Sequence, residues 1–212
     1  MKKRILFFVI LVIAIAVIAI AFVSSRKRYS PEEQAYIKKI EQFRSEKNEE
    51  MKNSSDSPFN AKGKIHFENL KYFPVDPSYV FYSKLTEYDK KDTIIIYGTK
   101  GEPRKSLRYG YVTIKVDGKN YKVNVYKGYS VHTGEEYYAI WFTDKTTNNE
   151  TYGVGRYLDF EKNINKDYLY TIDFNKAYNP YCAYSPNYSC AVPTREDYLD
   201  IEIKAGEKKF HN

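Results

Sequence analysis

Carboxylate, amide, guanidinium and phenol side chains are concentrated in residues 141–190, and one further glutamate lies close to the C-terminus. Because side chains alternate along a strand, Asp173 and Asn175 come to one face, whereas Arg156 and Asp159 point to opposite faces. Polar side chains that converge at strand ends commonly line pockets. The sequence therefore predicts a ligand pocket formed by Asp144, Tyr152, Arg156, Asp159, Asp173, Asn175, Tyr178 and Glu207.

These residue types favour particular chemistry. Arg156 could hold a carboxylate or phosphate in a bidentate grip, and carboxylates in unlike environments could serve as general acid and base. The chain has 23 tyrosines, whose rings stack well on sugars, so a small molecule or glycan of the cell envelope is the expected ligand. Whether the pocket is catalytic stays open. The alternative is that the same residues form buried ion pairs and tyrosine–carboxylate hydrogen bonds between strand ends.

Signatures of the common catalytic and cofactor sites are missing. The sequence contains no G-x-G-x-x-G, phosphate loop, G-x-S-x-G or H-E-x-x-H motif. The three histidines, His66, His132 and His211, lie outside the polar segment, and residues 144–150 lack the spacing of a calcium loop. We therefore expect no cofactor, no metal site and no serine–histidine catalytic machinery.

The net charge of +7 comes almost entirely from the N-terminus. Six of the seven charges belong to Lys2–Arg4 and Arg26–Arg28, and residues 29–212 carry 28 basic against 27 acidic side chains. Nucleic-acid binding needs a basic surface. We therefore expect no nucleic-acid partner.

Residues 5–23 are 19 consecutive apolar residues without a charge, glycine or proline. A helix of this length spans roughly 28 Å, close to the hydrocarbon core of a bilayer. The run is long for a cleaved signal peptide and is followed by a poor cleavage site, so a retained signal anchor is favoured over cleavage. The numbers of basic residues on the two sides of the run are nearly equal, but the short segment before it favours a cytoplasmic N-terminus. We predict a single-pass protein of the cell membrane with an extracytoplasmic C-terminal domain.

A helix is predicted directly after this segment. Ser30 is a good cap, Pro31 suits the first helical position, and Glu33 completes a capping box. The helix should end near Asn48, with a loop up to residue 60. Its apolar stripe consists of Tyr36, Ile37, Ile40 and Phe43. We expect this stripe to pack on the domain, with a stalk or partner-binding helix as the alternative.

Beyond Ala61 the sequence shows strand patterns. The clearest is a hairpin in which residues 111–116 and 121–125 alternate on either side of the turn 117–120. Further strands are expected at 78–85, 93–97, 137–142, 156–160, 168–174 and 199–204. Residues 137–142 are apolar enough to be covered on both faces. About eight strands and one convincing helix predict a mainly β fold, either an antiparallel β-barrel or a sandwich.

Cys182 and Cys190 are the only cysteines and bracket a short loop. In an exported domain such a pair favours a disulfide, which would contribute roughly 2–3 kcal/mol and pin the loop 178–188. A two-cysteine metal site would need further ligands, and a redox pair is more often C-x-x-C. Both remain less favoured alternatives.

Four blocks of this sequence carry a resemblance to a known family. They are D-K-T (144–146), E-T-Y-G-x-G-R-Y-L-D (150–159), D-F-N-K-A-Y-N-P-Y-C-A-Y (173–184) and I-K-A-G-E-K (203–208). The chain resembles the uncharacterised DUF1684 family, over about residues 36–208. The family pattern after the second cysteine is proline-rich and ends in Glu-Asn, whereas this chain has Glu196-Asp197 there, so no role is carried over for an asparagine. The resemblance implies no activity, because none is established for the family.

We therefore expect three segments: a transmembrane signal anchor with basic flanks (1–28), an amphipathic helix and loop (29–60), and a β-rich extracytoplasmic domain (61–212). The favoured function is binding of, or action on, a small molecule or glycan of the cell envelope. The alternative is a non-catalytic envelope scaffold or assembly partner that binds another envelope protein.

Overall fold

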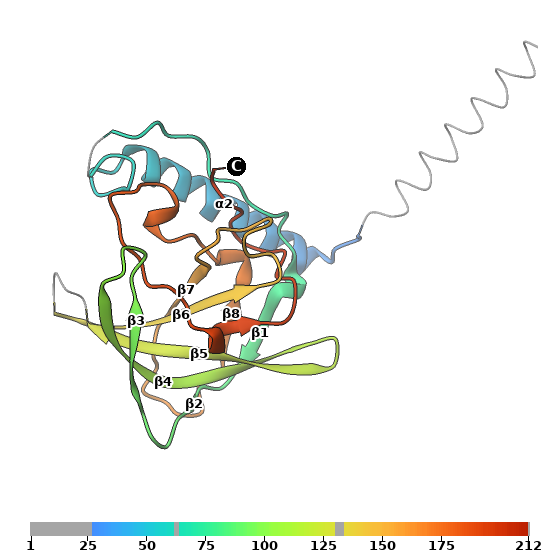
Figure 1. Ribbon diagram of the computed structural model, residues 1–212. Helices are drawn as coiled ribbons and strands as arrows, with labels where there is room; N and C mark the ends of the chain where they lie inside the picture. Colours follow the sequence, from blue (N-terminus) through green and yellow to red (C-terminus); the bar gives the residue numbers. More distant parts are fainter. Residues whose placement is uncertain (1–26, 62–63, 130–133, 212) are drawn as a thin grey trace, which may run out of the picture. The chain divides into compact units, whose positions relative to one another are not determined.

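The computed structural model describes residues 27–61, 64–129 and 134–211 (Figure 1). The chain divides into two compact units, residues 1–35 and 36–212. The predicted membrane segment, residues 5–23, lies outside the described residues. Within the described ranges, no helix combines the length and the apolar character needed to cross a bilayer.

Helix α2 (Pro31–Asn53) begins where the sequence predicts. The capping box is formed: the Ser30 amide donates to the Glu33 carboxylate (2.7 Å), and the Glu33 amide donates to the Ser30 hydroxyl (3.2 Å). The helix continues past the predicted end near Asn48 because Met51 packs into an apolar cluster. This cluster consists of Met51, Phe59, Leu70, Tyr184 and Phe210.

The part of α2 that belongs to the unit 36–212 packs on the β domain. Ile40 is only 1% exposed. Arg44 is also buried, and its guanidinium donates to the carbonyl oxygens of Phe73 (2.8 Å) and Asn175 (3.1 Å). Phe43, by contrast, stays exposed. The stripe therefore packs on the domain as expected, except at Phe43.

The strands of the described residues form two sheets. They are β1 (Val80–Ser83), β2 (Thr86–Glu87), β3 (Thr93–Tyr97), β4 (Pro103–Val116), β5 (Lys119–Tyr129), β6 (Glu136–Asp144), β7 (Arg156–Phe160), β8 (Tyr170–Asp173) and β9 (Tyr198–Leu199). The larger sheet has the order β2-β4-β5-β6-β7, with β3 also on β4 and β9 on β6, and β1 pairs with β8 separately. All pairs are antiparallel except β6–β9. The predicted mainly β, antiparallel architecture is confirmed.

The larger sheet is open, so the alternative of a closed barrel is wrong. One edge carries β2 and β3, and the other edge is β7. The outer side of β7 does not meet a strand from the opposite edge. Instead, Tyr157 exchanges two backbone hydrogen bonds with Tyr178 (2.9 and 3.0 Å). Because this segment occupies the edge, the sheet cannot close there.

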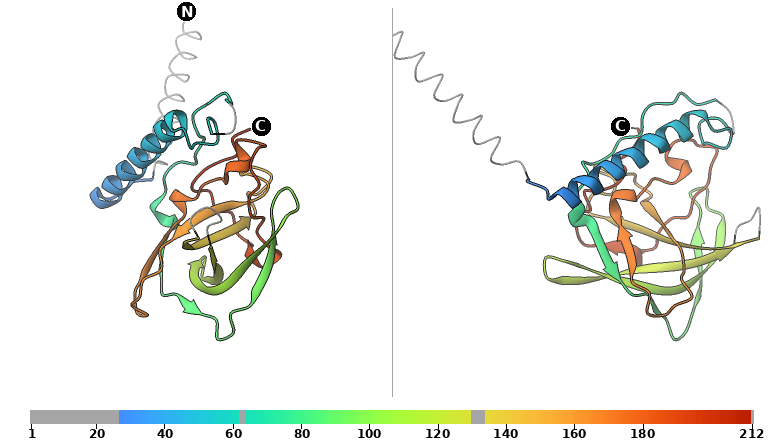
Figure 2. Two further views of the ribbon diagram at one scale, coloured as in Figure 1. Left: turned by 90° about the vertical axis from the view of Figure 1, so that its left-hand side faces the viewer. Right: turned by 180° about the vertical axis from the view of Figure 1, so that it is seen from behind.

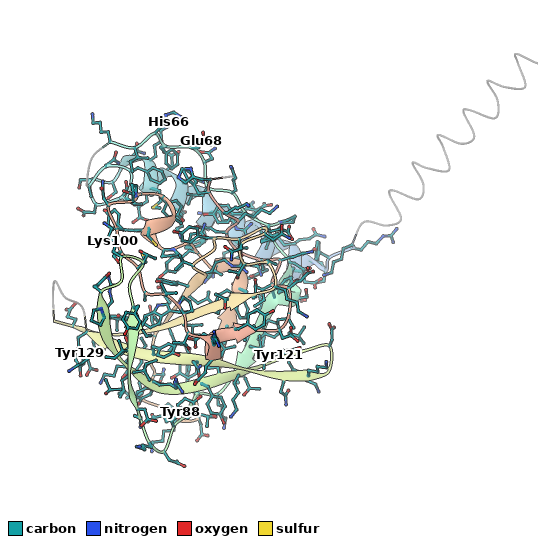
Figure 3. The ribbon with its side chains drawn as sticks, viewed as in Figure 1. His66, Glu68, Tyr88, Lys100, Tyr121 and Tyr129 are labelled. Carbon is teal, nitrogen blue, oxygen red and sulfur yellow. The ribbon has the colours of Figure 1, made fainter. Side chains whose placement is uncertain are left out.

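The predicted hairpin is formed by β4 and β5 (Figure 2). Val116 pairs with Lys119, and both turn residues between them have positive φ, 48° for Asp117 and 80° for Gly118. Such a turn matches the twist of the flanking strands. Figure 3 labels Tyr121 and Tyr129 towards the two ends of β5.

Strand β6 is covered on both faces, as predicted. Ile140 and Phe142 belong to the main core, which also contains residues of β4, β5, β7 and β8. Trp141 points to the opposite face and stacks on Tyr126 at 4.9 Å between ring centroids. Residues of both faces, Ile140 and Trp141, contribute to the candidate site.

The predicted strand at 199–204 is mostly wrong, since β9 ends at Leu199. The chain beyond it is irregular because the carbonyl oxygens of Ile203 and Ala205 accept hydrogen bonds from the buried Arg156 side chain. They are therefore used by a side chain and not by a neighbouring strand.

Candidate ligand groove

The predicted pocket residues fall into separate groups, the first of which is a buried ion pair. Arg156 is 1% exposed, and its Nη2 lies 2.8 Å from Asp144 Oδ2. The same guanidinium donates to the carbonyl oxygens of Ile203 (2.8 Å), Ala205 and Glu207 (3.4 Å). Burial lowers the pKa of Arg156, and Asp144 opposes that shift. These contacts tie β6 and β7 to the C-terminal segment, which matches the structural alternative for this pair.

A second group caps the end of β8. Both carboxylate oxygens of Asp173 accept from the Tyr36 hydroxyl at 2.8 Å, and Asp173 Oδ1 also accepts from the Asn175 amide at 3.0 Å. The Asn175 side chain bonds the backbone of Asp76 in both directions (2.9 and 2.8 Å). Burial and the Asp173 carboxylate raise the pKa of the Tyr36 hydroxyl. Asp173 and Asn175 are brought together as predicted, with partners from within the protein.

The third group is a row of polar side chains that starts on β7. The Tyr178 hydroxyl donates to Asp159 Oδ1 at 2.6 Å. The Lys47 ammonium lies 4.5 Å from the centroid of the Tyr178 ring and 3.0 Å from Glu207 Oε1. Burial, and then Asp159, raise the pKa of Tyr178. Lys47 was not among the predicted residues, because nothing in its local sequence points to a partner near the C-terminus.

Glu207 is buried behind this row. Its Oε2 accepts from the Asn179 amide (3.0 Å) and from the Tyr184 hydroxyl. Gly206 allows this close approach, since it has φ +74° and a Cβ there would lie 2.5 Å from the carbonyl oxygen of Ala177. Burial and Glu207 together raise the pKa of Tyr184.

The predicted disulfide is not formed. Cys182 and Cys190 are both free, and the Cys182 amide donates to Cys190 Sγ at 3.2 Å. A hydrogen bond from Cys190, more than any other contact, lowers the pKa of Cys182 to about 7, although burial opposes this shift. The Tyr152 hydroxyl donates to the Cys182 carbonyl oxygen at 3.1 Å. The loop that the disulfide was expected to pin is held by such hydrogen bonds, including one from Arg104 Nη2 to the Ser189 carbonyl oxygen at 2.8 Å.

A groove of about 1400 Å³ is lined by residues of β6, β7 and β8 and of the connection between β7 and β8. Helix α2 and the segment 178–191 also contribute to it. Its lining includes the aromatic side chains of Tyr137, Trp141, Tyr157, Tyr178, Tyr181 and Tyr188.

Three of the predicted residues line this groove: Asp159, Asp173 and Tyr178. The other five lie outside its lining: Asp144, Tyr152, Arg156, Asn175 and Glu207. The face alternation predicted for β7 is correct, since Arg156 and Leu158 are buried while Tyr157 is half-buried and Asp159 is exposed. In the described part of the chain, no three His, Cys, Asp or Glu residues are grouped to hold a metal ion.

The model of one protein family, described as protein of unknown function (DUF1684), matches residues 65–208. The chain belongs to the DUF1684 family. The predicted resemblance is thus confirmed, and the DUF1684 match contains both the groove strands and the motif segment 144–190. No curated protein matches the chain.

Solved structures similar to this DUF1684 protein include the solution NMR structure of an uncharacterised protein of Haloarcula marismortui, which is 25% identical and has a TM-score of 0.61. The alignment covers 84% of this chain and 96% of the other.

Proposed function

We propose that this DUF1684 protein is a glycan-binding protein of the cell envelope and that the groove over β6 and β7 holds the sugar chain. The observation that carries the proposal is the groove itself, about 1400 Å³, lined by tyrosine rings with carboxylates beside them. Aromatic faces provide broad apolar contact for sugar rings, and carboxylates accept hydrogen bonds from sugar hydroxyl groups.

The membrane location belongs to the same proposal. Residues 5–23 would anchor the chain as a single transmembrane helix, and the domain would face the extracytoplasmic side, where envelope glycans lie. An anchored domain needs only moderate affinity for a single chain, because the membrane keeps it close to its ligand.

The proposal is tested by fluorescence titration, since Trp141 is the only tryptophan and lines the groove. The purified full-length chain in mild detergent is titrated with tetramers of N-acetylglucosamine, glucosamine and galacturonate. A saturable change in emission with at least one of them is expected. Flat titrations with all three, repeated by calorimetry, would reject glycan binding by this groove.

Two tyrosine variants locate the binding. Tyr137 lines the groove and is 40% exposed, whereas Tyr82 on β1 is 65% exposed and lies outside the lining. Tyr137→Ala should weaken sugar binding by about 1 kcal/mol or more, as truncated aromatic contacts commonly do, and Tyr82→Ala should not. Equal behaviour of the two variants would favour the envelope scaffold, which needs no groove ligand.

A further inference from the structure

The charges of the groove narrow the class of its ligand, provided that the proposed function holds. Five acidic and four basic side chains belong to the lining. The acidic ones are Glu46 and Glu50 on α2, Asp159, Glu161 and Asp173, and the basic ones are Lys47, Arg104, Lys162 and Lys176. The lining therefore contains nearly equal numbers of acidic and basic side chains.

The basic side chains are largely neutralised by carboxylates that are not part of the lining. Three of the four cations have such a partner. The pairs are Lys47–Glu207 (3.0 Å), Arg104–Glu102 (2.6 Å) and Lys162–Glu87 (3.7 Å). Lys176 instead lies 5.9 Å from the centroid of the Phe43 ring. Glu87 also pairs with Lys91 at 2.9 Å. Lys47 and Arg104 are therefore neutralised, Lys162 is neutralised in part, and Lys176 keeps its charge.

The acidic side chains of the lining are not neutralised in this way. Among the described residues, no ion pair joins any of the five to a lysine or arginine. Asp159 accepts from the Tyr178 hydroxyl and Glu46 from the Gln42 amide. Such neutral donors satisfy an oxygen but leave the charge, so the groove keeps a negative field.

We propose that the groove selects a sugar chain with protonated amines, that is, an amino sugar, over neutral and acidic sugars. The ammonium groups would pair with Glu46, Glu50 and Asp159 and approach the faces of the tyrosine rings. An acidic sugar would meet the same carboxylates with like charge.

The test compares four tetramers in the Trp141 titration: glucosamine, N-acetylglucosamine, galacturonate and lysine. The glucosamine tetramer should bind about tenfold more tightly than its neutral N-acetylated counterpart, the sum of a few exposed charge pairs. Equal or tighter binding of the neutral or acidic sugar overturns amine selection and leaves the proposed function standing. Binding of tetralysine alone would make the groove a basic-peptide site and overturn the proposal, and failure of all sugars would overturn the proposed function as well.

A double variant that removes two negative charges tests whether the carboxylates of α2 cause this selectivity. Glu46→Gln with Glu50→Gln changes two exposed residues of α2 and should weaken binding of the glucosamine tetramer about fivefold without changing that of the N-acetylated tetramer. Glu68→Gln is the matched control, because Glu68 is exposed on the segment between α2 and β1 and lies outside the lining (Figure 3). An equal loss for both tetramers, or a loss in the control, overturns the proposal.

Discussion

Replacing Arg156 with alanine should lower the free energy of unfolding by about 3–5 kcal/mol, because it removes one partner of a buried ion pair. The size of this loss follows from the contacts of Arg156. Asp144 would keep donors from the amide groups of Thr146 (2.8 Å) and Ile203 (3.2 Å) but lose its counter-charge. The carbonyl oxygens of Ile203 and Ala205 would also lose a donor, and each unsatisfied buried group costs roughly 1–3 kcal/mol.

The assay is urea unfolding of the full-length chain in detergent, followed by the emission of Trp141, which lies on β6 in the same strand as Asp144. With a slope of about 2 kcal/mol per molar urea, a loss of ~4 kcal/mol moves the midpoint down by roughly 2 M. Arg195→Ala is the control, because Arg195 is exposed and should change the stability by less than about 0.5 kcal/mol.

The structural role of Arg156 can be refuted by one result and supported by a double variant. An Arg156→Ala midpoint equal to that of Arg195→Ala, together with lost ligand binding, would refute the structural role and return Arg156 to the ligand site. Replacing both charges in Asp144→Leu with Arg156→Met should recover only part of the stability, because no buried charge is then left alone but the carbonyl oxygens of Ile203 and Ala205 still lack their donor.

Two further predictions concern the cysteines and the N-terminus. Alkylation of Cys182 by iodoacetamide should increase with pH with a midpoint near pH 7, because the thiolate is the reactive form, whereas Cys190, whose pKa is raised, should react little. Cys190→Ala removes the main hydrogen-bond donor to Cys182 and should move the Cys182 midpoint to higher pH. An unchanged midpoint in mass-spectrometric alkylation profiles would contradict this. The full chain should stay with membranes through a carbonate wash and lose that association when residues 1–28 are deleted, whereas equal release of both forms would contradict the proposed anchor.

Local patterns in the sequence were sufficient for several elements. The capping box at Ser30, the turn Asp117-Gly118 and the alternation along β7 each involve residues close in the chain, and the structure has all three. The family assignment likewise rests on contiguous blocks, and it is confirmed over residues 65–208. The strand predicted at 199–204 does not continue past Leu199, and the Ile203 carbonyl oxygen accepts a hydrogen bond from Arg156, which is distant in the sequence.

Alternation and turn geometry are local properties of the backbone, so the mainly β architecture and the two faces of β7 can be predicted from the residue pattern. The burial of Arg156, and the position of Asp159 and Tyr178 in a groove that Lys47 of α2 also reaches, follow from packing between distant segments. The reason is sequence separation: the Lys47–Glu207 pair joins two ends of the domain. Such contacts depend on how the elements pack, which no local pattern specifies.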